Sequence, residues 1–129
     1  MATETMQTVL VDTDVAIDFL RGNAYAKELL ENLWREGRAS ISTLSVYELD
    51  AGMRDQERKA TKAFLDACCI ADVTREIAEK AGEMRREYQK RGITVPSMDC
   101  LIAATALVSG YKIATKNKRH FPESLMLGV

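Results

Sequence analysis

Apolar residues in this chain fall into short unbroken runs that alternate with longer stretches in which they recur every three or four positions. The unbroken runs predict strands, and the periodic stretches predict amphipathic helices. The run at 8–11 is almost wholly apolar, which predicts a strand buried on both faces. The further predicted strands are 39–43, 69–73 and 111–115, with 125–127 as a short fifth strand at an edge.

Helices are predicted between these strands. A glycine follows four of the helical stretches, at a position where a left-handed backbone commonly ends a helix. Ser45 and Glu48 have the S-x-x-E spacing of a capping box, which predicts that one helix begins there and places Glu48 in its first turn. The predicted helices are 14–21, 24–36, 45–53, 55–67, 74–91 and 98–109.

Strands that are separated by helical crossovers favour a parallel sheet covered by helices. We therefore expect an α/β fold, a three-layer α/β/α domain around a central, mainly parallel sheet of four to five strands. A length of 129 residues suits one domain, so residues 1–129 are expected to form a single domain.

The charge balance changes the expected partners. Lys and Arg number 18 against 19 Asp and Glu, which gives a net charge of −1. This excludes a protein that coats nucleic acid by bulk electrostatics, because such domains are strongly basic. The total does not exclude a local site for nucleic acid.

The cysteines and the N-terminal residues indicate the cellular compartment in which the protein is expected. Three cysteines, with Cys68 and Cys69 adjacent and no CxxC pair, are typical of free thiols in a reducing compartment and not of a zinc site or disulfides. Residues 1–5 lack the basic start and apolar run of a signal peptide. No stretch approaches the roughly 18 apolar residues of a membrane span. We expect a soluble cytoplasmic protein with no membrane partner.

Three acidic residues are directed to one edge of the predicted sheet. Asp12 ends the first strand, while Glu48 and Asp99 lie near the start of crossover helices. The carboxyl ends of parallel strands and the N-termini of the crossover helices meet at the same edge, where ligands bind in such sheets. Clustered carboxylates repel one another, and a hard divalent cation such as Mg²⁺ or Mn²⁺ relieves that repulsion.

Each of these acids also has a purely structural interpretation, which the sequence leaves open. Glu48 would close its capping box, Asp99 would be an ordinary first-turn acid, and Asp12 would cap the helix that follows it. Against this, Ile102 and Ala106 share a helix face with Asp99, which places its carboxylate beside an apolar, inward-facing stripe.

Several segments resemble the PIN-domain family, and most closely its VapC-type toxin ribonucleases. They are VLVDTDV at 9–15, STLSVYEL at 42–49, MDCLIAATA at 98–106 and the closing TKNKRHF at 115–121. No single motif is specific, but the four occur in the family's order and cover essentially the whole chain.

The resemblance implies a metal-dependent endoribonuclease that hydrolyses RNA phosphodiester bonds. Asp12, Glu48 and Asp99 would be its catalytic residues and would hold Mg²⁺ or Mn²⁺, with Glu48 acting directly or through a coordinated water. The resemblance also implies a VapB-like antitoxin as partner and a homodimeric toxin.

One position departs from the family pattern. His120 stands where these toxins often carry a further acid, although Thr115 and Asn117 match the closing segment. Asp14 stands where Asn or Ser is usual, so we expect it to restore a carboxylate. Thr115, Asn117, Asp14 and His120 are therefore candidate accessory or substrate-binding residues, and a lone loop histidine is more often simply solvated.

Two surfaces are candidates for partners. Lys116, Lys118 and Arg119 form a basic run that would contact an RNA backbone or belong to an ordinary solvated loop. Apolar residues on the first two helices would either line an antitoxin groove or pack in the core; these are Phe19, Leu20, Tyr25, Leu30 and Trp34.

Other function classes stay open. A PIN-like module that binds RNA or protein without cleaving it is favoured by His120 and disfavoured by the complete set of three acids. An aspartate-nucleophile phosphatase of the haloacid dehalogenase type would use Asp12 and Asp14, but Ala16 stands where that family expects Thr or Val. Dinucleotide binding is disfavoured because no GxGxxG follows the first strand.

Overall fold

A computed structural model describes residues 7–127, so the N-terminal stretch 1–5 lies outside the described residues. Its centre is a parallel sheet of four strands in the order β3-β2-β1-β4. The strands are β1 (Val9–Val11), β2 (Ala39–Ser42), β3 (Cys69–Ala71) and β4 (Lys112–Ala114). The predicted α/β class and the parallel sheet are confirmed.

The expected fifth strand at 125–127 is wrong. Glu123–Leu125 form a short 3₁₀ helix, η4, and only Met126 pairs with the sheet, through a single parallel bridge to Ile113. The turn after Pro122 consumes the residues that would otherwise extend beside β4, and the Leu127 amide makes one hydrogen bond of 3.0 Å to the Ile113 carbonyl.

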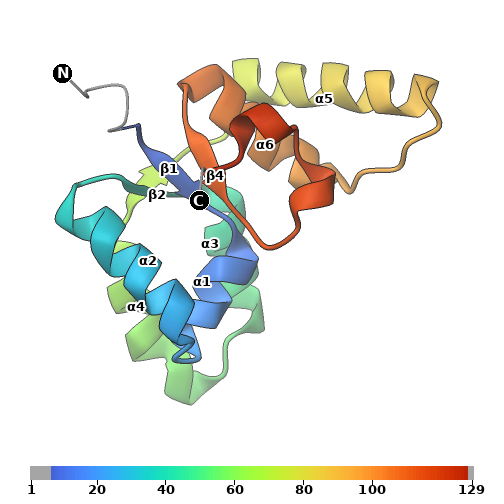
Figure 1. Cartoon of the computed structure of the whole chain (residues 1–129). Coiled ribbons are helices and arrows are strands. Elements are labelled where there is room, and N and C mark those ends of the chain that lie inside the picture. Colours follow the sequence, from blue (N-terminus) through green and yellow to red (C-terminus); the bar gives the residue numbers. More distant parts are fainter. Residues whose placement is uncertain (1–6, 128–129) are drawn as a thin grey trace, which may run out of the picture.

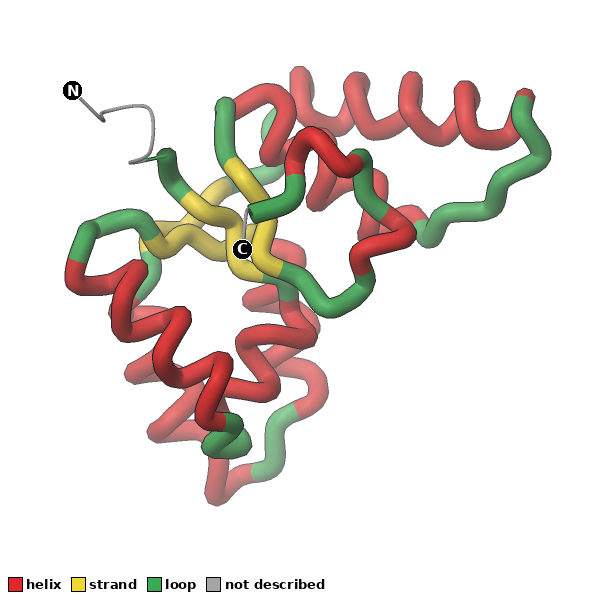
Figure 2. The backbone as a smooth tube through the Cα atoms, in the orientation of Figure 1, coloured by secondary structure: helices red, strands yellow, loops and turns green. Residues whose placement is uncertain are grey.

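Helices cover both faces of the sheet (Figure 1). Figure 2 shows the strands between two groups of helices, with α1, α2 and α4 on one side and α5 and α6 on the other. Helix α3 follows β2 directly and contacts α1 and α4. The helices are α1 (Thr13–Leu20), α2 (Ala24–Arg35), α3 (Thr43–Gly52), α4 (Arg58–Ala67), α5 (Arg75–Lys90) and α6 (Ser97–Ser109).

The central strand β1 has side chains in the core on both faces of the sheet. Val9 and Val11 pack in the cluster formed with α1, α2 and α4, whereas Leu10 packs in the cluster with α6 and Ile113. All three β1 residues are fully buried. Their alternation follows from the two-residue period of a strand, and an apolar residue is required at every position because both faces are covered.

Helix α3 begins earlier than its sequence pattern predicts. The Ser42 hydroxyl accepts a hydrogen bond of 3.0 Å from the Leu44 amide, so Ser42 is the N-cap and Thr43 the first helical residue. Ser45 is buried inside the helix, and the predicted capping box with Glu48 is wrong. Glu48 lies one turn further along, so its carboxylate does not cap this helix.

The predicted helix at 55–67 is confirmed in its extent, but its first turn is 3₁₀ and not α-helical. Asp55–Glu57 form a short 3₁₀ turn, η2, before α4, and the Glu57 side chain accepts a hydrogen bond from the Arg54 amide at 2.7 Å. Within residues 7–127, no helix combines the length and apolar character that crossing a membrane requires.

Candidate acidic site

Asp12 joins the end of β1 to the start of α1. It is 8% exposed, and its Oδ1 accepts a hydrogen bond of 2.9 Å from the Thr13 amide as the N-cap of α1. Its Oδ2 accepts a hydrogen bond of 2.7 Å from the Thr115 hydroxyl, which follows β4. The pKa of Asp12 is raised to about 6, mainly by burial and to a smaller extent by the charges of Asp14 and Asp99, while the Thr115 and Thr13 hydrogen bonds oppose the rise.

Asp14 lies two residues after Asp12, in the first turn of α1, and binds the segment after β4. Its Oδ2 accepts a hydrogen bond of 3.0 Å from the Lys116 amide. Its Oδ1 is buried and has no hydrogen-bond partner among the described residues. Burial raises the pKa of Asp14, and the Lys116 amide opposes the rise. A buried carboxylate oxygen without a donor is costly, and a cation would relieve that cost.

Glu48 is connected to this edge of the sheet by a contact with Thr13. The Thr13 hydroxyl lies 2.5 Å from Glu48 Oε1 and 2.8 Å from the Ser45 hydroxyl, so it ties α1 to α3. Glu48 is otherwise exposed. Sequence reasoning assigned no role to Thr13, although the signal was present: it directly follows Asp12 at the end of a strand, where its side chain faces the neighbouring crossover helix.

Asp99 lies in the first turn of α6, as predicted. Its Oδ2 is 2.7 Å from Nδ1 of His120 and 3.4 Å from Nδ2 of Asn117. The predicted inward stripe beside it is confirmed, since Ile102 and Ala106 are buried. His120 is therefore not a simply solvated loop residue: its side chain is 25% exposed and contacts a candidate site acid.

The short 3₁₀ helix η3 (Lys118–His120) determines where His120 lies. Asn117 precedes this helix, and its backbone N–H donates a hydrogen bond of 3.0 Å to the Thr115 hydroxyl. Phe121 follows it and is buried in the cluster with Leu10 and Ile113. Because both ends are anchored, the loop holds His120 and Asn117 against α6.

The candidate residues form two groups, and the side chains within each group contact one another. Asp12 and Asp14 meet Thr115 and its neighbour Lys116, while Asp99 meets Asn117 and His120; Glu48 contacts Thr13 beside the first group. Within residues 7–127, no three side chains of Asp, Glu, His or Cys are arranged to enclose one metal ion. The donor set nevertheless fits a hard cation, because it consists mainly of carboxylate oxygens and includes the unpartnered Oδ1 of Asp14.

The basic run is only partly available to a ligand. The Lys116 ammonium pairs with Asp18 of α1 at 2.9 Å, and this pairing raises the pKa of Lys116. Lys118 and Arg119 are exposed. Lys118 and Arg119 are thus the side chains of this run that form no ion pair among the described residues.

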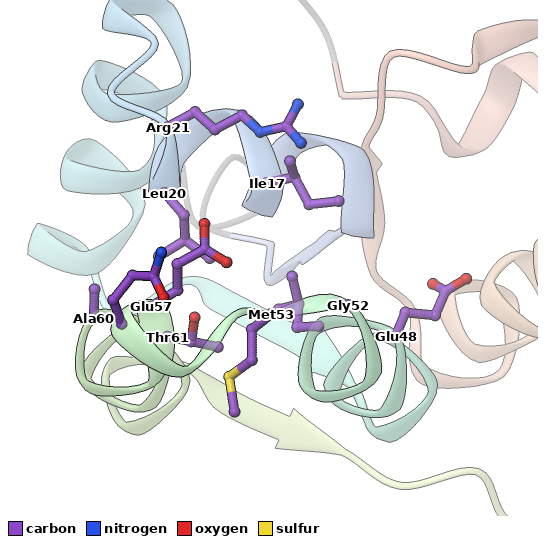
Figure 3. Close-up of a pocket in the computed structure, with 11 residues that line it drawn as sticks. Ile17, Leu20, Arg21, Glu48, Gly52, Met53, Glu57, Ala60 and Thr61 are labelled. Atoms are coloured by element: carbon purple, nitrogen blue, oxygen red, sulfur yellow. The ribbon is translucent and has the colours of Figure 1, made fainter.

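A groove lies beside Glu48, between α1, α3, η2 and α4 (Figure 3). Its volume is about 240 Å³. Figure 3 shows Glu48 at one side of the groove and Ala60 at the other. The wall combines apolar side chains with Arg21 and the two acids Glu48 and Glu57; its apolar members are Ile17, Leu20, Leu49, Met53 and Ala60.

Of the five residues predicted to face a groove or the core, Leu20 lines this groove. Leu30 is fully buried in the core, so the packing interpretation holds for it. Tyr25 is 72% exposed and lies on α2, outside the groove. Phe19 and Trp34 pack edge to face with ring centroids 5.1 Å apart, which also indicates a packing role.

Comparisons with known proteins agree with one another. The family model described as PIN domain matches residues 9–123. Ribonuclease VapC19 of Mycobacterium tuberculosis is 40% identical over 114 residues, which cover 88% of this chain and 91% of that protein. Ribonuclease VapC1 of Methanocaldococcus jannaschii is 32% identical over 88% of this chain and 78% of its own length.

Solved structures show the same fold. A toxin-antitoxin complex from Klebsiella pneumoniae contains a chain with a TM-score of 0.75 and 26% identity, covering 90% of this chain and 92% of that one. A chain of VapBC2 from Rickettsia felis, solved bound to a DNA fragment from its promoter, has a TM-score of 0.80 at 22% identity and covers 94% and 97% of the two chains.

Proposed function

The chain belongs to the PIN-domain family, and we propose on that basis that it is a metal-dependent endoribonuclease that acts as a VapC-like toxin. Its relatives are ribonucleases by name, which supports RNA as the substrate class. The observation that carries the proposal is the buried Asp12 carboxylate, whose charge is opposed by burial and by the nearby carboxylates of Asp14 and Asp99. A cation at this edge of the sheet would relieve that repulsion.

Asp12 and Asp99 are the proposed metal ligands, and Glu48 completes the acidic site. When bound, Mg²⁺ or Mn²⁺ supplies Lewis-acid polarisation of a phosphate and lowers the pKa of a water. Thr115 orients Asp12 through its hydrogen bond to Oδ2, and Thr13 orients Glu48 through its contact with Oε1. Lys118 and Arg119, exposed on the neighbouring loop, would contact the RNA backbone.

The test is RNA cleavage by the purified protein with Mg²⁺ or Mn²⁺. Asp12→Asn and Asp99→Asn should each lower the cleavage rate by about 100-fold or more, and chelation of the metal should abolish cleavage. Asp66→Asn, at an exposed acid on α4, is the matched control and should retain full activity. Equal activity in wild type and both site variants would indicate a contaminating nuclease and reject the proposal.

We propose that the groove beside Glu48 receives a segment of a VapB-like antitoxin. Complexes of this kind are among the structural neighbours. The groove is lined by apolar side chains and by two acids, Glu48 and Glu57, against one base, Arg21, which suits a segment with apolar side chains and a basic residue. Such a basic residue would approach the acidic site from the side of Glu48. The proposed assembly pairs this antitoxin with a toxin homodimer.

Filling the groove tests this partner. Ala60→Phe places a large side chain in the groove, and we expect it to weaken binding of the antitoxin encoded beside this chain at least tenfold while RNA cleavage is retained. Ala67→Phe adds the same side chain at an exposed position of the same helix that does not line the groove, and antitoxin binding should be unchanged. Equal effects of the two substitutions would contradict the assignment. Light scattering of the toxin alone tests the homodimer.

One contact favours a second candidate function, a PIN-like module that binds RNA or protein without cleaving it. His120 contacts Asp99 Oδ2, so one candidate ligand atom is already engaged by a neighbour. The same cleavage assay separates the two functions. Tight RNA binding without metal-dependent cleavage would favour the module.

A further inference from the structure

Three polar atoms from α6 and the closing loop form a compact triangle. Nδ1 of His120 lies 2.7 Å from Oδ2 of Asp99 and 2.8 Å from the side-chain amide nitrogen of Asn117. The third side, between the Asn117 amide and Asp99 Oδ2, measures 3.4 Å. The triangle lies outside the Asp12 and Asp14 group, and one of its members is a nitrogen base.

In this arrangement the hydrogen-bonding groups of Asp99, Asn117 and His120 cannot all have suitable partners. Nδ1 of His120 carries either a proton or a lone pair. With a proton it suits Asp99 but opposes the Asn117 NH₂ group, and with a lone pair it suits Asn117 but opposes the Asp99 carboxylate. Rotation of the Asn117 amide by half a turn exchanges its nitrogen for its oxygen. The triangle then presents a carboxylate oxygen, an imidazole nitrogen and an amide oxygen.

These separations match those between neighbouring ligands of one octahedral ion. Metal–ligand distances near 2.1 Å at right angles place adjacent donor atoms about 3 Å apart. We propose that Asp99, Asn117 and His120 form one face of the divalent-metal site, and that the His120 nitrogen makes Mn²⁺ or Co²⁺, in place of Mg²⁺, its preferred ion. This deepens the proposed function, because Asp12 is the acid expected to supply the opposite side.

The chemistry of the donors decides the preference. Mg²⁺ selects oxygen ligands, whereas imidazole suits first-row transition ions, whose affinities rise from Mn²⁺ to Co²⁺ and beyond. An acid at position 120 would keep the ligands all oxygen. Compared with such an acid, His120 therefore changes the type of ion selected and not only the charge of the site.

The loop is built to hold this face in place. The backbone N–H of Asn117 donates to the Thr115 hydroxyl, which in turn donates to Asp12, so the backbone of the loop that carries the triangle is tied to the other group of acids. Buried Phe121 anchors the following residue. The side chains of Asp99 and His120 are 15% and 25% exposed, so both are shielded from most of the surrounding water but can still be reached from the surface.

Pulsed electron paramagnetic resonance of bound Mn²⁺ tests the ligand directly. The chain contains one histidine, so in tag-free protein any coupling from a directly bound imidazole ¹⁴N must come from His120. We expect this coupling in the wild type and its loss in His120→Asp and His120→Gln. Its absence from the Mn²⁺-loaded wild type would overturn the proposal and indicate that the imidazole only hydrogen-bonds to Asp99 and Asn117.

Metal affinities provide the second measurement. By calorimetry, the ratio of Co²⁺ to Mg²⁺ affinity should fall at least tenfold in His120→Asp, which restores an all-oxygen set; an unchanged ratio would overturn the proposal. His120→Gln guards against misfolding of the more acidic variant, and it should also lose the Co²⁺ preference. Neither readout requires RNA, so a nitrogen signal without ribonuclease activity would reject the proposed function alone, and metal-dependent cleavage without that signal would reject the ligand role alone.

Discussion

The Thr115 hydroxyl donates a hydrogen bond of 2.7 Å to Oδ2 of Asp12 across 103 positions of sequence. The bond joins the carboxyl ends of β4 and β1, two neighbouring strands of the sheet. Thr115 is itself 7% exposed, so water does not replace this donor readily. The contact stabilises the ionised form of the carboxylate on which the proposed site depends.

Removal of this hydroxyl should destabilise the protein. Thr115→Val leaves Oδ2 of buried Asp12 without its donor, and we expect a loss of about 1–3 kcal/mol in the free energy of unfolding at pH 7.5. The pKa of Asp12 should rise above about 6, since the hydrogen bond lowers it. Urea unfolding and NMR titration of the carboxyl group measure the two effects. Thr115→Ser keeps the hydroxyl and should resemble the wild type; a serine variant as unstable as the valine variant would contradict this account.

The buried Asp12 carboxylate predicts a pH dependence of stability in metal-free protein. Its pKa is 3.8 when unperturbed and about 6 in the fold, so ionisation costs more in the folded state than in the unfolded chain. Below pH 3.8 this cost is absent, it grows as the pH rises to about 6, and it is constant above that at no more than about 3 kcal/mol. Asp12→Asn removes it.

Urea unfolding with a chelator at pH 4.5 and pH 7.5 measures the effect. The gain in stability of Asp12→Asn over the wild type should be larger at pH 7.5. A gain that is the same at both pH values would show that ionisation of Asp12 is not its source.

Asp14 is expected to restore the carboxylate that His120 replaces. Asp14→Asn keeps an oxygen for the Lys116 amide but removes the charge on the buried, unpartnered Oδ1. Metal affinity should fall about tenfold, in the range typical of residues that support a metal site. Asp18→Asn, on the same helix, breaks only the ion pair with Lys116 and should leave metal affinity unchanged. Unaltered affinity and cleavage in Asp14→Asn would exclude the compensation.

Two residues of α2, Leu30 and Tyr25, allow a buried position to be compared with an exposed one. Leu30 is fully buried among β1, β2 and α1, so Leu30→Ala should cost about 2–5 kcal/mol of unfolding free energy through lost burial and a cavity. Tyr25 is 72% exposed on the same helix, and Tyr25→Ala should change stability by less than about 0.5 kcal/mol. Thermal and urea unfolding compare the pair. A comparable loss in the tyrosine variant would place Tyr25 in the core.

Local pattern predicted most of the elements because each depends on nearby residues. The buried run of β1 and the amphipathic helices are visible as periods of hydrophobicity. The pattern predicts the start of the helix at 43–52 two residues late, because Ser42 and Ser45 are both suitable caps and only the end of β2 selects between them. The prediction of a fifth strand at 125–127 is wrong for a related reason. The apolar residues there do not reveal the 3₁₀ turn at Glu123–Leu125.

The sequence by itself placed Asp12 and Asp99 at the same edge of the sheet, because parallel strands separated by crossover helices have their carboxyl ends together. Only the tertiary structure decided which groups touch. Thr13 meets Glu48, Thr115 meets Asp12, and His120 meets Asp99. These contacts join side chains that are 21 to 103 positions apart, and they depend on packing and loop geometry that no local period of the sequence encodes.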